Sequence, residues 1–311
     1  MIVCFAPNPS IDKHFEVERV EPGAIHRPTA LMRVPGGKGL NVARAAATLG
    51  AEVHVVALLG GHAGRWIADE LAGLRIPLTA VWSAFETRSC LSVADLETGS
   101  LTEFYEGASP VSTTEWAEFV QSAQELGARA SWTTASGSLP PGAPATGYAE
   151  LVDGQNTVAD TRELGGARPA LVKVNAAEAA ALAGFACDTA SAAIAAARAL
   201  RDLAGGDGHA AVVTRGRHGA VLLTPDGAAW QASLDVIGPY PVGSGDAFLA
   251  GLVVALDRAE TWPDALRVAV AAGVANAELP GAGRLDRGRA EQLVAHVRLE
   301  QVAAHSALES E

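Results

Sequence analysis

The sequence predicts an α/β fold, with a doubly wound, mainly parallel sheet flanked by helices and a small second sheet inserted into it. Short aliphatic runs alternate with alanine-rich stretches of helical length, which is typical of strands joined by crossover helices. Residues 11–34 and 87–106 break this rhythm with the alternation and the turn residues of β-hairpins. We interpret residues 1–311 as one domain, and we call the small sheet that these two segments would form the lid.

The expected elements follow this alternation along the chain. Residues 1–7 read as a buried first strand, and residues 53–59 as another that a Gly-Gly turn joins to a helix. Further strands are expected at 131–135, 157–159, 171–174 and 210–214, where Lys173 is the one charge in otherwise uncharged runs. Helices are expected at 42–49, 65–74, 176–182, 192–203 and 246–256, which are rich in good helix formers.

Composition excludes several classes of protein. Hydrophobic residues make up 49% of the chain and charged residues 19%, as in a folded globular protein. No run approaches the roughly 18 apolar residues of a membrane-spanning helix, and the N-terminus lacks the basic start of a signal peptide. We therefore expect a cytoplasmic protein with no membrane partner. The net charge of −12 argues against nucleic-acid binding, which needs clustered Lys and Arg. Cys4, Cys90 and Cys187 are too few and scattered for a disulfide framework or a Cys-rich metal site.

The strongest local signal is a glycine-rich turn before a helix, Gly243-Ser244-Gly245-Asp246. Backbone N–H groups that turn toward one point, at the positive end of a helix dipole, form a cradle for an anion such as a phosphate in transfer. Asp246 would stand at the helix start, where its carboxylate can accept the proton of a hydroxyl group. The alternative is that Asp246 is only a helix cap, and the turn by itself leaves the two interpretations even.

A second glycine cluster, Gly36-Gly37-Lys38-Gly39-Leu40-Asn41, opens the next helical segment. It is not a Walker P-loop, because Gly39 follows Lys38 where that motif requires Ser or Thr. Close backbone approach at Gly36 and Gly37, with the cation of Lys38 and the amide of Asn41, suits an anionic polyol. A plain tight turn is the alternative.

Asn175 and Glu178 follow a predicted strand and are three residues apart, so they would share one face of a first helical turn. An amide and a carboxylate so placed can hold water around Mg²⁺, which retains much of its hydration shell. The spacing by itself favours a helix cap with a glutamate at the third position. Two further loops, 136–142 and 214–219, are weak signals because they only lie where α/β folds place ligands.

Taken together and in order, five segments resemble the ribokinase-like sugar kinase family, in its phosphofructokinase B branch. They are Asn8-Pro9-Ser10-Ile11-Asp12, the cluster 36–43, Ser136-Gly137-Ser138-Leu139-Pro140, Lys173-Val174-Asn175 with Glu178, and Gly243-Ser244-Gly245-Asp246. Any one of them is unspecific, but five in register, from the first strand to near residue 286, are highly specific. The resemblance implies a doubly wound α/β body with a β lid, ATP as the phosphoryl donor, and Mg²⁺.

The same resemblance implies roles for individual residues. Asp246 is the catalytic base, and Gly243, Ser244 and Gly245 form the anion hole. Near the nucleotide lie Asn175, Thr214, Gly216, Gly219, Gly245 and Asn276, and both Asn175 and Glu178 act on the metal through water. On the acceptor side are Asp12 for sugar hydroxyls, Gly36, Gly37 and Asn41 for the sugar, and Lys38, Arg88 and Ser138 for its existing phosphate.

Within the family, Thr87-Arg88 and the loop 22–27 resemble the phosphosugar kinases, chiefly 1-phosphofructokinase and tagatose-6-phosphate kinase. The expected reaction is ATP-dependent phosphorylation of a ketohexose phosphate at a primary hydroxyl, with fructose 1-phosphate, fructose 6-phosphate and tagatose 6-phosphate as candidates. His26 and the segment 160–163 depart from the family pattern and leave the identity of the sugar open. Alternatives are a kinase of an unphosphorylated sugar or nucleoside, and a non-catalytic sugar-phosphate sensor. An exposed lid invites pairing, so a homodimer through the lid is also expected.

Overall fold

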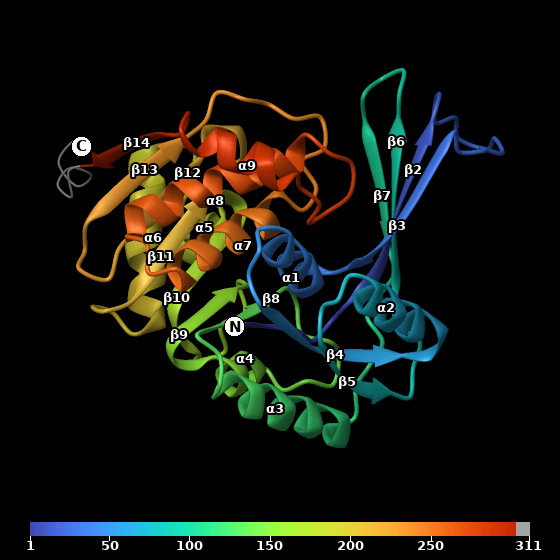
Figure 1. The fold of residues 1–311 in the computed structure, drawn as a ribbon, viewed down its shortest axis with the longest axis horizontal. Coiled ribbons are helices and arrows are strands. Elements are labelled where there is room, and N and C mark those ends of the chain that lie inside the picture. The colour runs from blue at the N-terminus through green and yellow to red at the C-terminus, as the bar shows by residue number, and fades with distance from the viewer. Residues whose placement is uncertain (303–311) are drawn as a thin grey trace.

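The structure contains one large and one small β-sheet (Figure 1). The computed structural model describes residues 1–302, and the side chains of all of these except Asp153 and Gln155. The large sheet has the strand order β14-β13-β12-β11-β10-β9-β8-β1-β4-β5, and every pairing from β5 to β11 is parallel. The last three strands, β12 to β14, run antiparallel at one end. The expected mainly parallel sheet is therefore confirmed.

The strands of the large sheet have the following bounds. They are β1 (Ile2–Ala6), β4 (Val53–Gly60), β5 (Leu78–Ser83), β8 (Trp132–Ser136), β9 (Asp153–Asp160), β10 (Arg168–Asn175), β11 (Ala210–Thr214), β12 (Ala220–Leu223), β13 (Ala229–Ser233) and β14 (Arg298–Val302).

Helices cover both faces of this sheet. One face carries α1 (Lys38–Thr48), α2 (Gly61–Gly73), α7 (Ser244–Asp257), α8 (Trp262–Ala277) and α9 (Arg287–Val294), which share a core with Ile2 and Cys4 of β1. The opposite face carries α3 (Thr113–Gly127), α4 (Gly147–Leu151), α5 (Ala176–Ala183) and α6 (Ala190–Ala204), which share a core with Val3 and Phe5. Successive side chains of a strand point to opposite faces, so the apolar run of β1 supplies both cores. Among residues 1–302 no helix is long and apolar enough to cross a membrane.

The second sheet is the lid, and it projects from the body as a separate blade (Figure 1). It consists of β2 (Ser10–Val17), β3 (Ala30–Gly36), β6 (Ser89–Asp95) and β7 (Leu101–Tyr105), in the order β3-β2-β6-β7. The central pair β2–β6 is parallel and the outer pairs are antiparallel. The two segments expected to pair as a small sheet therefore do so. Asp12 lies between Val34 and Cys90 in this register, and Cys90 lies beside Tyr105.

Four helices begin earlier than expected, α6 at Ala190 rather than at residue 192 among them, and two of the shifts affect the glycine clusters. α1 begins at Lys38 and α7 at Ser244, so Gly37 and Gly243 are their N-caps, with φ of 85° and 81°. Each glycine has a left-handed φ that other residues avoid, which lets the backbone turn sharply into the helix. α2 begins at Gly61 rather than at residue 65, because the Glu86 carboxylate accepts from the Ala63 N–H in its first turn (2.5 Å).

Candidate active site

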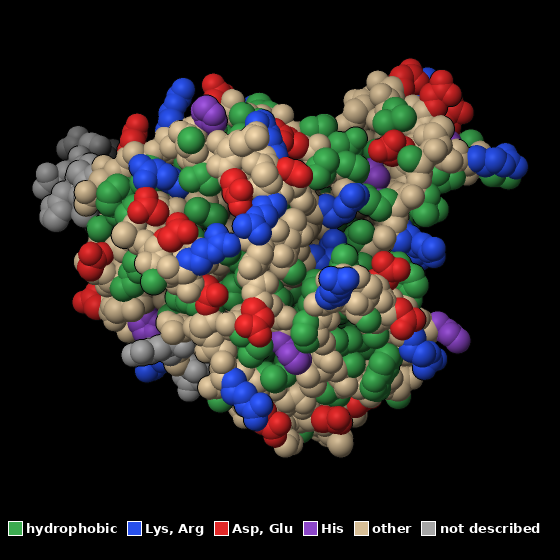
Figure 2. Space-filling view, in the orientation of Figure 1, with side chains coloured by type: hydrophobic (Ala, Val, Ile, Leu, Met, Phe, Trp, Pro, Cys, Tyr) green, Lys and Arg blue, Asp and Glu red, His purple; other side chains and the backbone are tan. Residues whose placement is uncertain are grey.

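A cleft of about 710 Å³ lies between the lid and the carboxyl ends of the parallel strands. This edge of an open α/β sheet is where ligands bind. Of the residues predicted for the site, those lining the cleft are Asp12, Gly37, Lys38, Asn41, Arg88, Ser138, Asn175, Thr214, Gly216, Gly219, Gly243, Ser244, Gly245 and Asp246. Lys and Arg side chains gather where the lid meets the body (Figure 2). The acidic chain therefore holds a local basic region, which an anionic substrate needs.

Asp246 is the third residue of α7 and is only 6% exposed. Asn41 at the start of α1 donates from Nδ2 to Asp246 Oδ2 at 2.9 Å. This hydrogen bond joins the two glycine clusters across 205 residues of sequence. Burial and the nearby Asp160 charge raise the pKa of Asp246 to about 6, although Lys173, Asn41 and Lys38 act in the opposite direction. A carboxylate with such a pKa is ionised at neutral pH and can still take up a proton.

Residues of α8 and of the segment after it pack against the glycine turn before α7. A Cβ on Gly243 would lie 2.4 Å from Ala282 Cα, so only glycine fits against the segment that follows α8. Asn276 on α8 donates to Val242 O at 3.0 Å and lies 3.5 Å from Ser244 Oγ. Asn276 is fully buried and does not line the cleft, so the structure places it behind the turn.

A buried ion network adjoins this turn. Asp160, at the end of β9, is fully buried and accepts from Lys173 at 2.8 Å and from Lys38 at 3.1 Å. Burial alone would raise the pKa of Asp160, but the two ammonium groups hold it below its usual range. Sequence reasoning missed Asp160 and Lys173 as site residues. The signals were present, because Lys173 is a lone charge within a buried strand and Asp160 follows the run 157–159.

Lys38, which was predicted to bind the acceptor phosphate, completes the network. Its Nζ is 3.1 Å from Asp160 and 3.2 Å from Glu178, and the charges of these carboxylates raise its pKa against the effect of burial. The ammonium group is therefore neutralised by carboxylates near Asn175. Arg88 and Ser138, which were expected to share the phosphate with it, make other contacts described below.

Asn175 and Glu178 form the helix cap that their spacing favoured. The Glu178 N–H donates to Asn175 Oδ1, and the Asn175 N–H donates to Glu178 Oε2, both at 2.9 Å. Within residues 1–302 no cluster of three His, Cys, Asp or Glu side chains can ligate a metal directly. Asn175 and the partly exposed Glu178 instead fit Mg²⁺ that keeps its waters and binds substrate phosphates, as such ions usually do.

The side of the cleft that was predicted to bind the acceptor is built largely by the lid. Ser10 Oγ donates to Asp12 Oδ1 at 2.6 Å, and a Cβ on Gly36 would lie within 2.3 Å of that carboxylate, so glycine leaves room for Asp12. Asn8 Nδ2 donates to Ser138 Oγ at 3.0 Å. In the part of the chain that the structure describes, Arg88 makes long hydrogen bonds of 3.4 Å to Asn8 O and 3.5 Å to Glu106 O, and its buried Nε meets no acceptor. Arg88 is thus a cation in the cleft wall that forms no ion pair with any described carboxylate, although its charge acts on Asp12.

The predicted nucleotide loop follows β11 and forms another wall. Thr214 Oγ1 donates to Val174 O at 3.4 Å, and residues Gly216–His218 form a short 3-10 turn. Gly219 has φ 78°, and a Cβ there would lie 1.9 Å from Ala232 O. The chain can follow this path only with glycine, which brings the backbone of the loop against β13.

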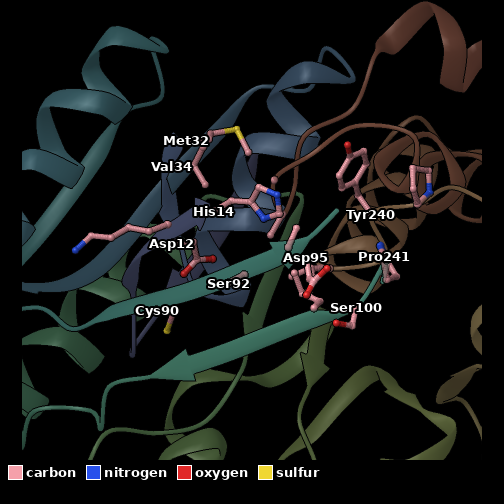
Figure 3. A pocket seen from close by; sticks show the side chains of 18 of the residues that line it. Asp12, His14, Met32, Val34, Cys90, Ser92, Asp95, Ser100, Tyr240 and Pro241 are labelled. Atoms are coloured by element: carbon pink, nitrogen blue, oxygen red, sulfur yellow. The ribbon is translucent and has the colours of Figure 1, made fainter. Parts of the chain in front are cut away.

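A second cavity of about 340 Å³ adjoins the predicted acceptor side (Figure 3). His14, Met32 and Val34 on the lid face Tyr240 and Pro241 of the body across it. The His14 and Tyr240 rings lie edge to face, with centroids 6.2 Å apart. Asp12, Cys90 and Tyr105 line both cavities, so the acceptor end of the cleft adjoins space between lid and body.

The chain is similar in sequence to curated sugar-phosphate kinases. The chain is 30% identical over 294 residues to 1-phosphofructokinase of Haloferax volcanii, covering 90% of this chain and 93% of that protein. It is 25% identical over 315 residues to tagatose-6-phosphate kinase of Staphylococcus epidermidis, covering 97% and 100%. The structure resembles phosphofructokinase-2 from Escherichia coli in complex with potassium, with a TM-score of 0.84 at 23% identity, covering 95% and 98%.

The family assignment rests on a match along most of the chain. Residues 7–286 match the model of the pfkB family carbohydrate kinases. This span contains the five segments quoted from the sequence, and the ribokinase-like fold expected from them is confirmed by the structural likeness. The chain therefore belongs to the pfkB family of carbohydrate kinases, and it is a kinase with a hydroxyl group as acceptor.

Proposed function

We propose that this protein is an ATP-dependent kinase of a ketohexose phosphate, with fructose 1-phosphate, fructose 6-phosphate or tagatose 6-phosphate as its acceptor. The observation that carries the proposal is the hydrogen bond between Asn41 and Asp246. This bond brings the glycine cluster 36–41, which is predicted to bind the acceptor, and the Asp246 carboxylate together in one cleft. A general base must lie in the same cleft as its substrate. The cytoplasm, where ATP is made available, is the proposed location.

Asp246 acts as the general base in this proposal. Above its pKa of about 6 the carboxylate is ionised and draws the proton from a primary hydroxyl of the sugar. ATP bound with Mg²⁺ supplies the phosphoryl group, and the turn Gly243–Gly245 holds that group's charge at the start of α7. Asn175 and Glu178 orient waters of the metal. Closure of the lid over the cleft excludes water as a competing acceptor.

A phosphorylated acceptor is favoured by Arg88. Its guanidinium lines the cleft beside Asn8 and Ser138, and within residues 1–302 no carboxylate forms an ion pair with it. A guanidinium suits a phosphate dianion, because it can donate two hydrogen bonds to it. Lys38 supports the donor side instead, since its partners are Asp160 and Glu178. An unphosphorylated sugar would leave Arg88 without a use in this wall.

A substrate panel with Arg88→Ala tests the acceptor. Turnover is measured with the three ketohexose phosphates and with fructose, ribose and adenosine. We expect turnover with a phosphosugar, and in Arg88→Ala a KM for it raised about ten- to 100-fold with a smaller change in kcat, as for a lost hydrogen bond to a charged group. Arg33→Ala, which removes a lid arginine lying over the Trp66 ring, is the matched control.

Two results would favour the alternatives. Preferred turnover of an unphosphorylated sugar or nucleoside, with a KM that Arg88→Ala leaves unchanged, would assign the protein to that acceptor class. Binding of phosphosugars without ATP turnover across the whole panel would indicate a sensor. Asp246 and its glycine turn argue against the sensor, because binding alone needs no base.

We also propose a homodimer through the outer face of the lid. Side chains alternate along each lid strand, so Phe15, Leu31, Leu91 and Phe104 lie on the face opposite to Asp12 and Cys90. Leu31 is 58% exposed and Phe104 60% exposed. A second copy of the chain would bury this apolar face.

A further inference from the structure

Arg44 is a buried cation that neither the sequence motifs nor the proposed reaction uses. It lies on α1, three residues after Asn41, and is only 6% exposed. Burying a charged group is costly unless hydrogen bonds compensate it. The Nη2 group of Arg44 donates to Asn41 Oδ1 at 2.8 Å and to Ala282 O at 2.5 Å. Both acceptors belong to the surroundings of Asp246.

The first contact orients an amide. A terminal amide has a donor end and an acceptor end that exchange places on rotation by half a turn. Arg44 carries only donors, so it holds the Asn41 oxygen toward itself and the nitrogen toward Asp246. The opposite orientation would place an oxygen against the carboxylate. Arg44 therefore selects the amide orientation in which Asn41 donates to the ionised base.

The second contact fixes the segment behind the glycine turn. Ala282, whose carbonyl accepts from Arg44, lies against Gly243, the N-cap of α7. The next residue, Gly283, leaves only 2.7 Å between its would-be Cβ and Asn41 O, so the same segment also packs on α1. Arg44 thus joins α1 to the support of the turn from which Asp246 projects.

Charge adds to geometry. Burial lowers the pKa of Arg44 to about 10, against the attraction of Asp12 and Asp246 and with the repulsion of Arg284, so it stays cationic at neutral pH. The groups that act most on Asp246 are Asn41 and Lys38 of α1, Asp160 of β9 and Lys173 of β10, and the charge of Arg44 also attracts its carboxylate. Removing one cation from this set favours the protonated carboxyl, because fewer positive charges stabilise the ion.

We propose that Arg44 is a positioning residue, which orients Asn41 and the segment 281–283 and thereby sets the direction and the proton affinity of the Asp246 carboxylate. The inference rests on the proposed role of Asp246 as base. Its test therefore includes a measurement that does not depend on activity.

Arg44→Lys and Arg44→Gln are compared with the wild type by carboxyl NMR titration of Asp246, with Asp246→Asn used to assign the signal. We expect the pKa of Asp246 to be higher in Arg44→Gln by about half a pH unit or more. The acidic limb of the pH profile of kcat/KM should shift in the same direction. The kcat should fall about tenfold or more, as is usual when a partner that orients a site residue is removed. Arg44→Lys keeps the positive charge but loses the geometry in which one group donates to both Asn41 and Ala282. We therefore expect a lower kcat with a smaller shift in the pKa of Asp246.

Arg258→Gln is the matched control. Arg258 also donates from Nη2 to a backbone carbonyl, that of Leu49 after the end of α1 (2.8 Å), but it does not line the cleft. It should lose stability without any change in the Asp246 titration. An unmoved titration and acidic limb in both Arg44 variants would overturn the inference. A retained kcat in Asp246→Asn would instead contradict the proposed base, and the NMR result would still decide the positioning role.

Discussion

The lid and the body contribute to the same cleft by opposite physical means. Lid strand β7 is exposed along its whole length, and the lid supplies Asp12, with Arg88 directly before β6. The body supplies Asp246 from a helix packed against α1 and α8, and Asp160 and Lys173 from buried strand ends. The lid side chains can meet a substrate that enters from solvent, whereas those of the body hold charges that water would otherwise screen. In the proposed mechanism, the lid therefore contributes to acceptor recognition, whereas the base and its charged neighbours belong to the body.

The largest expected effect is on the body side, at Asp246. Asp246→Asn should lower kcat by about 100-fold or more, since a positioned general base typically contributes at least that much. The matched control is Asp264→Asn, because Asp264 occupies the same third position of α8 after its Thr261 cap but is not buried. Steady-state kinetics of both variants would separate catalysis from capping. An equal, small loss of kcat in both variants would show that Asp246 only caps its helix.

The same substitution should stabilise the fold at neutral pH. The folded protein holds the Asp246 proton up to about pH 6, whereas an ordinary aspartate releases it near 3.8, so the wild type loses stability as pH rises between these values. Asp246→Asn lacks this loss, so its free energy of unfolding should exceed that of the wild type by about 1–3 kcal/mol at about pH 8. The difference should vanish near about pH 4. Urea unfolding at both pH values measures it. A difference that stayed constant with pH would show that burial of the charge is not its cause.

The smallest effect on stability is expected from a substitution on the outer face of the lid. Phe104→Glu should convert a dimer to a monomer in sedimentation while changing the unfolding free energy by less than about 0.5 kcal/mol, as surface substitutions usually do. Phe185→Glu, at a 42% exposed phenylalanine on the body, should leave the association state unchanged. A wild type that sediments as a monomer at assay concentration would rule out the lid dimer.

Sequence reasoning predicted the body well because its signals are local. The parallel strands, the helices around them and the two glycine turns follow from runs and turns within about ten residues of each other. The start of α2 was placed late, since the carboxylate that caps it comes from Glu86 on another segment. No strand was assigned to β5 at the parallel edge, or to β12, β13 and β14, which end the sheet in antiparallel pairs. No helix was assigned to α3, α4, α8 or α9.

Sequence reasoning predicted which residues belong to the site better than it predicted which of them contact one another. The cleft brings together most of the expected residues, but the partners of Lys38 depend on which strand ends lie side by side. Asp160 and Lys173 meet because β9 and β10 are neighbours, and Arg44 acts through a contact 238 residues away. Such contacts arise from the tertiary fold, which spacing along the chain does not reveal.

The connections of the lid bear on how such kinases diversify. The chain leaves the body after β1 and returns at α1, and it leaves again after β5 and returns at α3. Neither excursion interrupts the pairing of β1, β4 and β5, so an insertion or a deletion in the lid reorders no strand of the large sheet. The lid hairpins can therefore differ in length among such kinases while the strand ends that carry Asp160 and Lys173 stay in place.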